Sequence, residues 1–578
     1  MNPPSASSPA QPDRLPSPPR PVWLGAALII LALGVAYANS FRGVLVLDDL
    51  QAIRDNPTLR HLAVALSPPA GGGTVSGRPL LNLTFALNYA LSGTALWSYH
   101  AGNLLIHALA VLTLFGLVRR TLRSPRLAAR FGPAADRLAG AIALLWALHP
   151  LQTESVTYVV QRAESLGGLW TLLTVYCFAR SGDAPARTRW LVASAAACLL
   201  GVATKETVAT APLLVLLYDR TFVSGSFRAA LERNYLLYHA FIVCWFLIGW
   251  QLIGNDVRGQ TVGFGSSVSW TLYALEQVQA VAHYLWLTVL PSPQVLDYGA
   301  VIAFDPVLFT VGLVLGGAVV AGTVLALWRW PALGFAGAWF IVILAPTTSI
   351  IPVATQAMAE HRMYLPLAAV MTLLVLGLYT RCGRAAVWIW LALVLAASGL
   401  TIRRNQDYAS PVALWTSCVE HSDNARARLN LGLALARAGR PAEAMDQFAA
   451  GQKLAPLNAE FDVRWGEILA GLGRMDEAQI HYAAALRLRP GYADAYLGLG
   501  RALEQLGRKD EALRAYAAGA RGSPLHIQAH YQFGCALLRA GQPEQAAREF
   551  ATVLRLDPQN PDAARELARA RRTPAPPP

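Results

Sequence analysis

Cysteine is scarce in this sequence. The 578 residues include only six cysteines, no CxxC pair, and four of the six lie in or beside apolar segments. Disulfide frameworks and thiolate metal sites need cysteines in closely spaced sets. The sequence therefore predicts neither a disulfide-stabilised fold nor a cysteine-bound metal.

Lysine is rarer still, because only Lys205, Lys453 and Lys509 are present. The formal net charge of +13 comes almost wholly from arginine, much of it in short loops between apolar runs. This distribution is typical of the cytoplasmic loops of a membrane protein. Membrane topology therefore explains the basic charge, and no nucleic-acid partner is predicted.

Long apolar runs fill the chain up to about residue 402. The hydrophobic content of 54% and the mean hydropathy of +0.37 exceed the usual values of soluble domains. We predict an all-α protein, with a polytopic helical membrane domain of about eleven spans over residues 22–403 and a soluble α-solenoid after it. Residues 1–21, rich in proline and serine, are expected to form a disordered cytoplasmic tail.

The first apolar run, Val22 to Ala38, admits two interpretations. Ala36-Tyr37-Ala38 resembles the small-residue site at which a signal peptide is cleaved. The run is long for a signal peptide and many apolar runs follow it, which favours an uncleaved first span. We therefore expect a cytoplasmic N-terminus and an external C-terminus.

Arginine placement predicts the sides of the membrane. Three arginine-rich loops, at residues 119–137, 180–189 and 220–233, are expected to face the cytoplasm. The first external loop, residues 41–100, then lies on the opposite side together with the other polar clusters. A full crossing by Leu272 to Leu290 would invert the later loops, so we expect this run to be re-entrant or interfacial.

From residue 425 the sequence repeats every 34 residues, a period that resembles the tetratricopeptide repeat. We predict four repeats over 425–560, after a connector at 404–424 and before a C-terminal tail at 561–578. Stacked helix pairs of this kind form a solenoid with a concave groove suited to an extended peptide. The repeated positions are Gly432, Gly466, Gly500 and Gly534; Gly439, Gly473, Gly507 and Gly541; Ala444, Ala478, Ala512 and Ala546; Phe448, Tyr482, Tyr516 and Phe550; and Pro456, Pro490, Pro524 and Pro558.

Ionisable and other polar residues interrupt the apolar sequence near the expected external side. Charges at such depth cost about 3 kcal/mol or more unless they are paired or face a wet cavity. An acidic turn, a structural histidine or a self-neutralising pair would each explain one cluster. Together, carboxylates that accept a proton and cations that bind phosphate describe a site joining an acceptor hydroxyl to a lipid-linked phosphate donor. The candidates are Asp48, Asp49, Arg78, His149, Glu154, Arg162, Glu164, Lys205, Glu206, Glu360, His361, Arg362 and Tyr364.

The order of these motifs resembles the polytopic membrane glycosyltransferases that use polyprenyl-phosphate sugars. Within that family the chain is similar to the protein O-mannosyltransferases that carry tetratricopeptide repeats. Gln152 and Gln161 depart from the family pattern, which affects the identity of the sugar more than the type of reaction. The motifs that carry the resemblance are Leu47-Asp48-Asp49, Arg78-Pro79-Leu80, Leu148-His149-Pro150, Thr153-Glu154, Arg162-Ala163-Glu164, Lys205-Glu206 and Glu360 to Pro366.

The resemblance implies an inverting, GT-C-type transfer of a sugar, expected to be mannose, from a polyprenyl phosphate to a Ser or Thr hydroxyl of an exported protein. It implies that Asp48 or Asp49 is the base and that Arg162, Lys205 and Arg362 stabilise the departing phosphate. The other candidates would line the donor phosphate and sugar site. The polyprenyl-phosphate sugar is a co-substrate, and the reaction is expected to be independent of metal or only weakly dependent on a divalent metal, which the sequence allows but does not indicate.

Two other functions fit the same sequence. The core could glycosylate a lipid or a polysaccharide, or it could anchor a non-catalytic scaffold whose repeats recruit envelope proteins. A peptide groove beside the site favours a protein acceptor, because it would raise the local acceptor concentration. The lysine-poor, arginine- and alanine-rich composition fits a bacterial chain, which predicts the inner membrane with periplasmic repeats, although an endoplasmic reticulum protein would share this topology.

Overall fold

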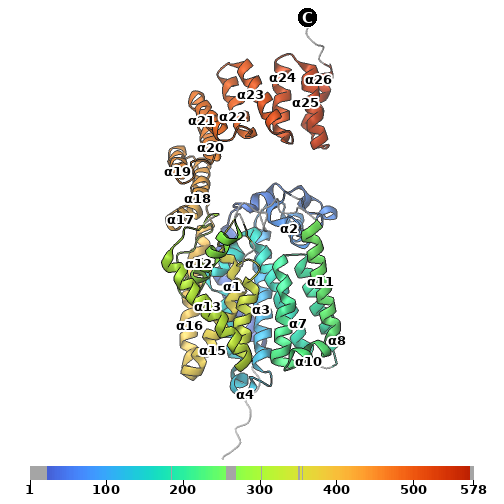
Figure 1. Ribbon diagram of the computed structural model, residues 1–578, viewed down its shortest axis with the longest axis vertical. Helices are drawn as coiled ribbons and strands as arrows, with labels where there is room; N and C mark the ends of the chain where they lie inside the picture. The colour runs from blue at the N-terminus through green and yellow to red at the C-terminus, as the bar shows by residue number, and fades with distance from the viewer. Residues whose placement is uncertain are drawn as a thin grey trace, which may run out of the picture.

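Helices form two bodies, a bundle and a curved solenoid above it (Figure 1). The computed structural model describes residues 22–572 except 70, 184, 255–268, 301, 349–351 and 354–355. Residues 1–21, which are expected to be disordered, and residues 573–578 of the expected C-terminal tail lie outside the described residues. The predicted all-α class, with an apolar helical domain and a repeat solenoid, is confirmed.

The bundle is built around α3, which packs along α5 and α7. Within the described residues, four helical segments are long and apolar enough to cross a membrane, and a fifth is added if the bent pair Ala128–Ala147 and Pro150–Thr157 counts as one span. Several other bundle helices, such as α8 with 16 residues and α9 with 8, are shorter than the roughly 20 residues that a bilayer requires, so the number of eleven spans stays a prediction. The bundle helices are α1 (Val22–Tyr37), α3 (Trp97–Leu122), α5 (Ala135–Ala147), α7 (Arg162–Arg180), α8 (Arg187–Val202), α9 (Ala211–Tyr218), α11 (Tyr235–Gly254), α12 (Trp270–Val289), α13 (Pro306–Arg329), α14 (Pro331–Leu344), α15 (Pro366–Cys382) and α16 (Ala386–Asp407).

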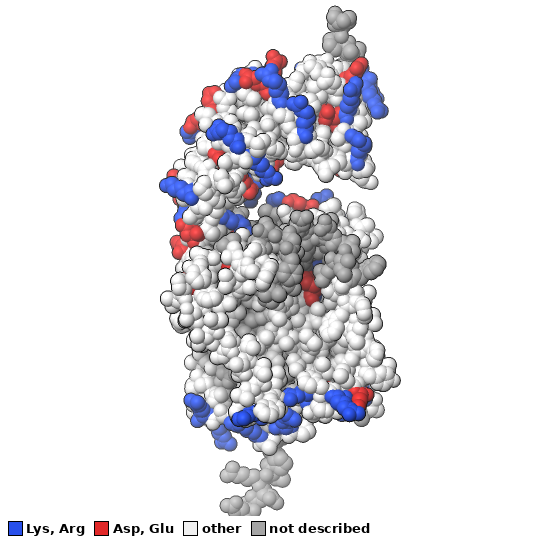
Figure 2. Space-filling model, viewed as in Figure 1, with Lys and Arg blue, Asp and Glu red and all other residues white. Residues whose placement is uncertain are grey.

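Charge separates the two ends of the bundle. The short helices α4 (Ala128–Phe131) and α10 (Phe227–Arg233) lie at the end away from the solenoid, in the arginine-rich loops (Figure 1). Figure 2 shows Lys and Arg side chains gathered at that end, below a broad face with very few charged residues. This end is called the arginine end below. Its position supports the topology expected from the loop arginines.

Helix α12 has a contact at the solenoid end of the bundle near each of its own two ends. Near its start, the Tyr273 hydroxyl donates to the carbonyl of Thr347, at 2.7 Å, just after the end of α14. Near its end, the carbonyl of Thr288 lies 3.3 Å from Nε2 of His149, just after the end of α5. Since both contacts lie at helix ends on the solenoid side, they support the interpretation that α12 does not cross the membrane.

The segment that we predict as the first external loop is a folded layer over the bundle. It contains α2 (Pro79–Ser92), which lies between the bundle and the solenoid (Figure 1). Helix α3 begins at Trp97, so the layer ends at residue 96, a few residues before the expected end of the loop at residue 100. This layer places residues 41–96 at the solenoid end of the bundle.

The 34-residue period translates directly into contacts between helices. A Cβ at Gly432 would lie 2.2 Å from the ring of Phe448, so only glycine admits this aromatic side chain. Gly439 has a φ of +75°, a conformation that favours glycine, in the turn between α18 and α19. The solenoid comprises α17 (Pro411–His421), α18 (Ala425–Arg437), α19 (Pro441–Leu454), α20 (Glu460–Gly471), α21 (Met475–Leu488), α22 (Ala493–Gln505), α23 (Lys509–Gly522), α24 (Ile527–Arg539), α25 (Pro543–Leu556) and α26 (Pro561–Arg572).

The segments that flank the repeats are helical. Helix α16 extends to Asp407 and α17 follows it, so most of the expected connector at 404–424 is helix. The expected tail at 561–578 begins with α26, which buries Ala563 and Ala570 against the preceding helices. A terminal helix of this kind covers the apolar face that the last repeat would otherwise expose.

Candidate active site

Asp48 is presented to solvent by an unusual backbone turn. Leu47 has a φ of +44°, a backbone conformation that residues other than glycine rarely adopt. The Asp48 carboxylate is exposed and accepts a hydrogen bond from the Thr74 hydroxyl at 2.9 Å. Its backbone N–H donates to the hydroxyl of Tyr158, at 3.1 Å. Strained turns that surrounding contacts hold in place are typical of functional sites.

Asp49 has a different environment from its neighbour. Its side chain is fully buried, with Oδ2 accepting the backbone N–H of Val46 at 2.9 Å and Oδ1 accepting that of Val160 at 2.7 Å. Burial raises the pKa of Asp49 well above the usual range of a carboxyl group, although the two N–H bonds oppose this shift. The acidic pair expected to supply the base thus contains one accessible carboxylate, that of Asp48. The other, that of Asp49, attaches the loop to the bundle through its hydrogen bonds.

Thr74 and Arg78 connect Asp48 to the α8–α9 turn. The carbonyl of Thr74, whose hydroxyl bonds Asp48, accepts a hydrogen bond from Nη1 of Arg78 at 2.9 Å. Nη2 of Arg78 lies 3.0 Å from Oε1 of Glu206. These contacts join the first external loop to the Lys205-Glu206 motif, more than a hundred residues later.

A second line of ionisable groups continues into the bundle. Nζ of Lys205 bonds Oε1 of Glu164, and Nε2 of His361 lies 3.7 Å from the same oxygen. Nδ1 of His361 is 2.7 Å from Oε1 of Glu154, and its backbone N–H donates to Oε2 of Glu154 at 3.0 Å. We call Asp48, Thr74, Arg78, Glu206, Lys205, Glu164, His361 and Glu154 the polar network.

A small cavity adjoins Glu164 in this network. Its volume is about 30 Å³, which is room for a water molecule. A sugar phosphate is much larger and would need this region to open. The lining includes the sequence-predicted residues Arg362 and Tyr364 and the hydroxyl side chains of Thr171, Thr207, Thr210 and Thr347.

Arg362 and Tyr364 are held in place by hydrogen bonds to neighbouring segments. Nη1 of Arg362 donates to the carbonyls of Thr347 and Ala357 at 3.0 Å each, and Nη2 donates to that of Gln356 at 2.6 Å. The Tyr364 hydroxyl lies 2.9 Å from Nδ1 of His107. Both side chains are therefore fixed at the wall of the cavity.

Arg162 lies outside the polar network, although the resemblance implies that it binds phosphate. Its side chain is 1% exposed. Its guanidinium donates to Asn103 at 2.6 Å, Asn88 at 2.6 Å and the carbonyl of Tyr99 at 2.8 Å. The group also lies 4.5 Å from the centre of the Phe85 ring. These contacts join α2, α3 and α7, so the geometry indicates that Arg162 positions helices.

His149 and Glu360 also make structural contacts. Nδ1 of His149 accepts the N–H of Leu151 at 3.3 Å and so caps the following turn. Oε1 of Glu360 accepts the N–H of Val295 at 2.6 Å and the hydroxyl of Tyr298 at 2.7 Å. Burial raises the pKa of Glu360 to about 7. Neither residue contacts the polar network directly.

Four residues of the site and its support escaped sequence reasoning. Asn103 and His107 interrupt the apolar run of α3, a signal that could have identified them. Thr74 lies in a Gly-rich stretch, and Tyr158 is one aromatic among many, so neither carried a distinguishing signal. In the part of the chain that the structure describes, no group of three or more His, Cys, Asp or Glu side chains is arranged to hold a metal ion.

Comparisons with known proteins locate a repeat family in the solenoid and find relatives that are similar to part of the chain. A family model described as Tetratricopeptide repeat matches residues 406–459, 463–526 and 531–573, so the chain carries these repeats. The chain is 37% identical over 185 residues to the Protein O-mannosyl-transferase Tmtc3 of Drosophila melanogaster, covering 28% of this chain and 20% of that protein. It is 35% identical over 186 residues to the Protein O-mannosyl-transferase TMTC1 of Homo sapiens, covering 30% of this chain and 20% of that protein. The matches thus span about a fifth of the length of these relatives.

Among solved structures, the crystal structure of MamA is similar to 27% of this chain and 91% of its own, with 23% identity and a TM-score of 0.24.

Proposed function

We propose that this membrane protein transfers a sugar, mannose, from a polyprenyl-phosphate donor to Ser or Thr hydroxyls of proteins on the solenoid side of the membrane. The observation that carries the proposal is the polar network, which links the exposed carboxylate of Asp48 to the cations Arg78 and Lys205. The similarity to relatives named protein O-mannosyl-transferases supports the same reaction.

Asp48 is the proposed general base. An acceptor hydroxyl that attacks the sugar must lose its proton, and a carboxylate within hydrogen-bond reach can take it. Asp48 is exposed at the solenoid end, and its only described side-chain partner is the hydroxyl of Thr74. Asp49 has no such freedom, because both of its oxygens accept backbone N–H groups. Its proposed role is to hold the loop that presents Asp48.

Arg78 and Lys205 are the proposed partners of the departing phosphate. A phosphate leaves without a general acid when fixed cations stabilise its negative charge. Lys205 is held by Glu164, and Arg78 by Glu206, so both cations are positioned before the donor arrives. Arg362 lines the adjoining cavity and would add positive charge there. In this proposal His361 and Glu154 orient Glu164 through their chain of contacts.

The solenoid is the proposed acceptor-binding body. Its first repeat is fixed to the bundle, because the guanidinium of Arg426 pairs with the buried carboxylate of Asp297. The pKa of Arg426 is raised: burial alone would lower it, but the carboxylates of Asp297 and Asp48 outweigh that effect. The first repeat therefore lies close enough to Asp48 for their charges to interact, and a peptide bound along the solenoid would be held near the base.

The test is intact-mass analysis of exported proteins from cells that lack this chain and cells that regain it. The wild type, Asp48→Asn and Asp55→Asn would be restored separately. Asp55 is a suitable control because it is an acid of the same loop whose exposed side chain pairs only with Arg54 among the described residues. We expect the wild type and Asp55→Asn to restore a hexose on Ser or Thr residues, and Asp48→Asn to leave it absent.

Full restoration by Asp48→Asn at wild-type protein level would remove the proposed base. If no protein changes mass in any strain while the repeats still capture exported proteins, the scaffold function would replace this proposal. A mass change confined to lipids or polysaccharides would identify the acceptor as non-protein.

A further inference from the structure

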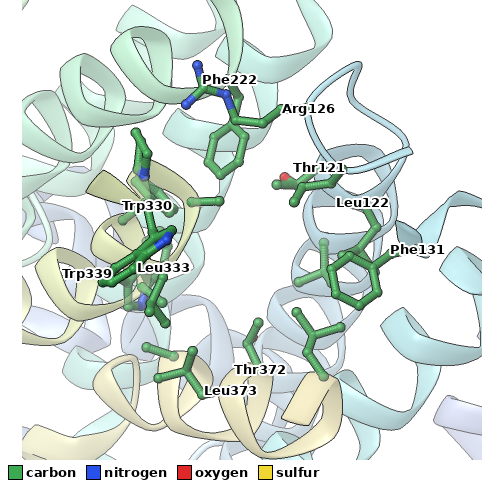
Figure 3. A pocket seen from close by; sticks show the side chains of 18 of the residues that line it. Thr121, Leu122, Arg126, Phe131, Phe222, Trp330, Leu333, Trp339, Thr372 and Leu373 are labelled. Carbon is green, nitrogen blue, oxygen red and sulfur yellow. The ribbon is translucent and has the colours of Figure 1, made fainter. Parts of the chain in front are cut away.

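A large cavity lies at the arginine end of the bundle, between α3, α14 and α15. Its volume is about 860 Å³, which is within the range of small-molecule binding sites. Figure 3 shows the side chains of Phe131, Trp339 and Leu373 around an open space, with Arg126 at its edge. We call this space the inner cavity. Its lining follows α15 from Thr380, near the end of that helix, back to Ala368 in its first turn, and it contains no residue of the polar network.

The inner cavity has an apolar interior and a basic rim. Its deeper walls include Leu114, Trp339 and Ala368, which are buried side chains without charge. Three arginines lie among its lining residues, and no aspartate or glutamate does. All three arginines, Arg126, Arg130 and Arg329, are exposed. An elongated apolar space that ends in three positive charges matches a molecule with a hydrocarbon body and an anionic head.

The rim arginines differ from others in the same loop. Arg119 and Arg123 pair with Asp136, and Arg120 pairs with Asp183. In contrast, the three rim arginines form no ion pair with any residue that the structure describes. Their charge is therefore available to a ligand, and guanidinium groups bind phosphate through two parallel hydrogen bonds.

We propose that the inner cavity binds an anionic glycerophospholipid from the leaflet at the arginine end. Its phosphate would lie against Arg126, Arg130 and Arg329, and its acyl chains would fill the space between α3, α14 and α15. Two features favour this occupant. Basic pockets between membrane helices on the cytoplasmic side attract anionic headgroups, since that leaflet carries the negative surface potential. Trp330, an exposed lining residue, has the amphipathic side chain that is enriched at headgroup depth.

The proposal is independent of the proposed function, because it involves the other end of the bundle and none of the network residues. A bound lipid would contact both α3 and α15. Helix α3 contains Asn103 and His107 at its other end, and α15 begins just after Arg362 and Tyr364 in the sequence. It would thereby stabilise the pair of helices that positions the cavity beside Glu164.

The test is native mass spectrometry of the full chain in neutral detergent, titrated with phosphatidylglycerol and, separately, with phosphatidylcholine of the same acyl chains. We expect one phosphatidylglycerol to bind at least tenfold more tightly than phosphatidylcholine. The triple variant Arg126→Gln, Arg130→Gln, Arg329→Gln should lose at least tenfold in phosphatidylglycerol affinity.

The matched control is Arg137→Gln, Arg381→Gln, Arg384→Gln, which removes the same charge from the same end without touching the inner cavity. We expect its affinity to stay within twofold of the wild type. A second variant, Gly377→Phe, fills the cavity without a change in charge. A Cβ at Gly377 meets no atom within 4 Å, so the helix should tolerate the substitution while the affinity falls.

Three results would overturn the proposal. Equal binding of the two lipids would show that the arginines do not recognise the phosphate charge. An equal loss in both triple variants would show a general attraction of anionic lipid to this end. Binding of polyprenyl phosphate with no binding of phosphatidylglycerol would assign the inner cavity to a different lipid.

Discussion

The two ends of the bundle use charge in opposite ways. At the solenoid end, Lys205 and Glu164 form an ion pair whose side chains are 8% and 13% exposed. At the arginine end, Arg228 and Glu232 form a pair whose side chains are 89% and 64% exposed. The first pair has been removed from water, at a large desolvation cost, and the second has not. Burial of the first pair therefore needs a reason beyond stability, and the proposed reaction supplies one.

The comparison also separates the charges by their partners. At the solenoid end the ionisable groups bond one another, from Glu154 through His361 and Glu164 to Lys205. At the arginine end, Arg126, Arg130 and Arg329 have no partner of opposite charge among the described residues. Paired charges fix a geometry, whereas unpaired ones set the topology and attract anions.

The strongest way to break this contrast is to remove one member of each pair. Lys205→Met leaves the carboxylate of Glu164 buried beside Glu154 and His361, so we expect a loss of about 3–5 kcal/mol in the free energy of unfolding. Arg228→Met should cost less than about 0.5 kcal/mol, because its pair is solvated. Chemical denaturation of both variants in detergent measures the difference, and similar costs would show that burial does not distinguish the two ends.

A pH series sharpens the contrast at the solenoid end. The pKa of Glu360 is raised by burial from 4.5 to about 7, so the folded state keeps a proton that the unfolded chain releases. The stability that Glu360 contributes is complete below pH 4.5 and is lost as the pH rises through about 7, with a total change of about 3 kcal/mol.

Glu360→Gln should reduce this loss, since an amide does not ionise. The measurement is the free energy of unfolding at pH 5 and pH 8 for both proteins. An identical pH dependence in the variant would contradict the raised pKa.

The smallest effect is expected at the arginine end. Exposed arginines away from any buried partner contribute little to stability. The variant Arg137→Gln, Arg381→Gln, Arg384→Gln should therefore change the free energy of unfolding by about 0.5 kcal/mol or less, as measured by denaturation. A larger loss would mean that this end also depends on specific charge contacts, which would remove the distinction between the two ends.

The sequence was sufficient for the solenoid because the repeat places contacting residues at fixed spacing. Gly432 and Phe448, predicted as repeat positions, meet as a helix pair requires. The order of the motifs likewise pointed to the polar residues of the site. The sequence could not show which of these residues contact one another, because the partners lie far apart in the chain. The Arg78–Glu206 contact joins residues 128 apart, and the His361–Glu154 contact joins residues 207 apart. Only the folded bundle shows that Asp48 is exposed, that its neighbour Asp49 is not, and that Arg162 is enclosed.

The most direct test of the account compares Asp48→Asn with Asp49→Asn in the purified full chain. Each variant would be measured twice, for mannose transfer from polyprenyl-phosphate mannose to a Ser/Thr peptide and for its free energy of unfolding. We expect Asp48→Asn to lose about 10²–10⁴-fold in kcat, as removal of a general base does, with unchanged stability. Asp49→Asn should lose about 1–3 kcal/mol in stability, because one of two buried N–H groups loses its acceptor. Wild-type kcat in Asp48→Asn, or abolished transfer in Asp49→Asn with unchanged stability, would contradict the assignment of Asp48 as the base.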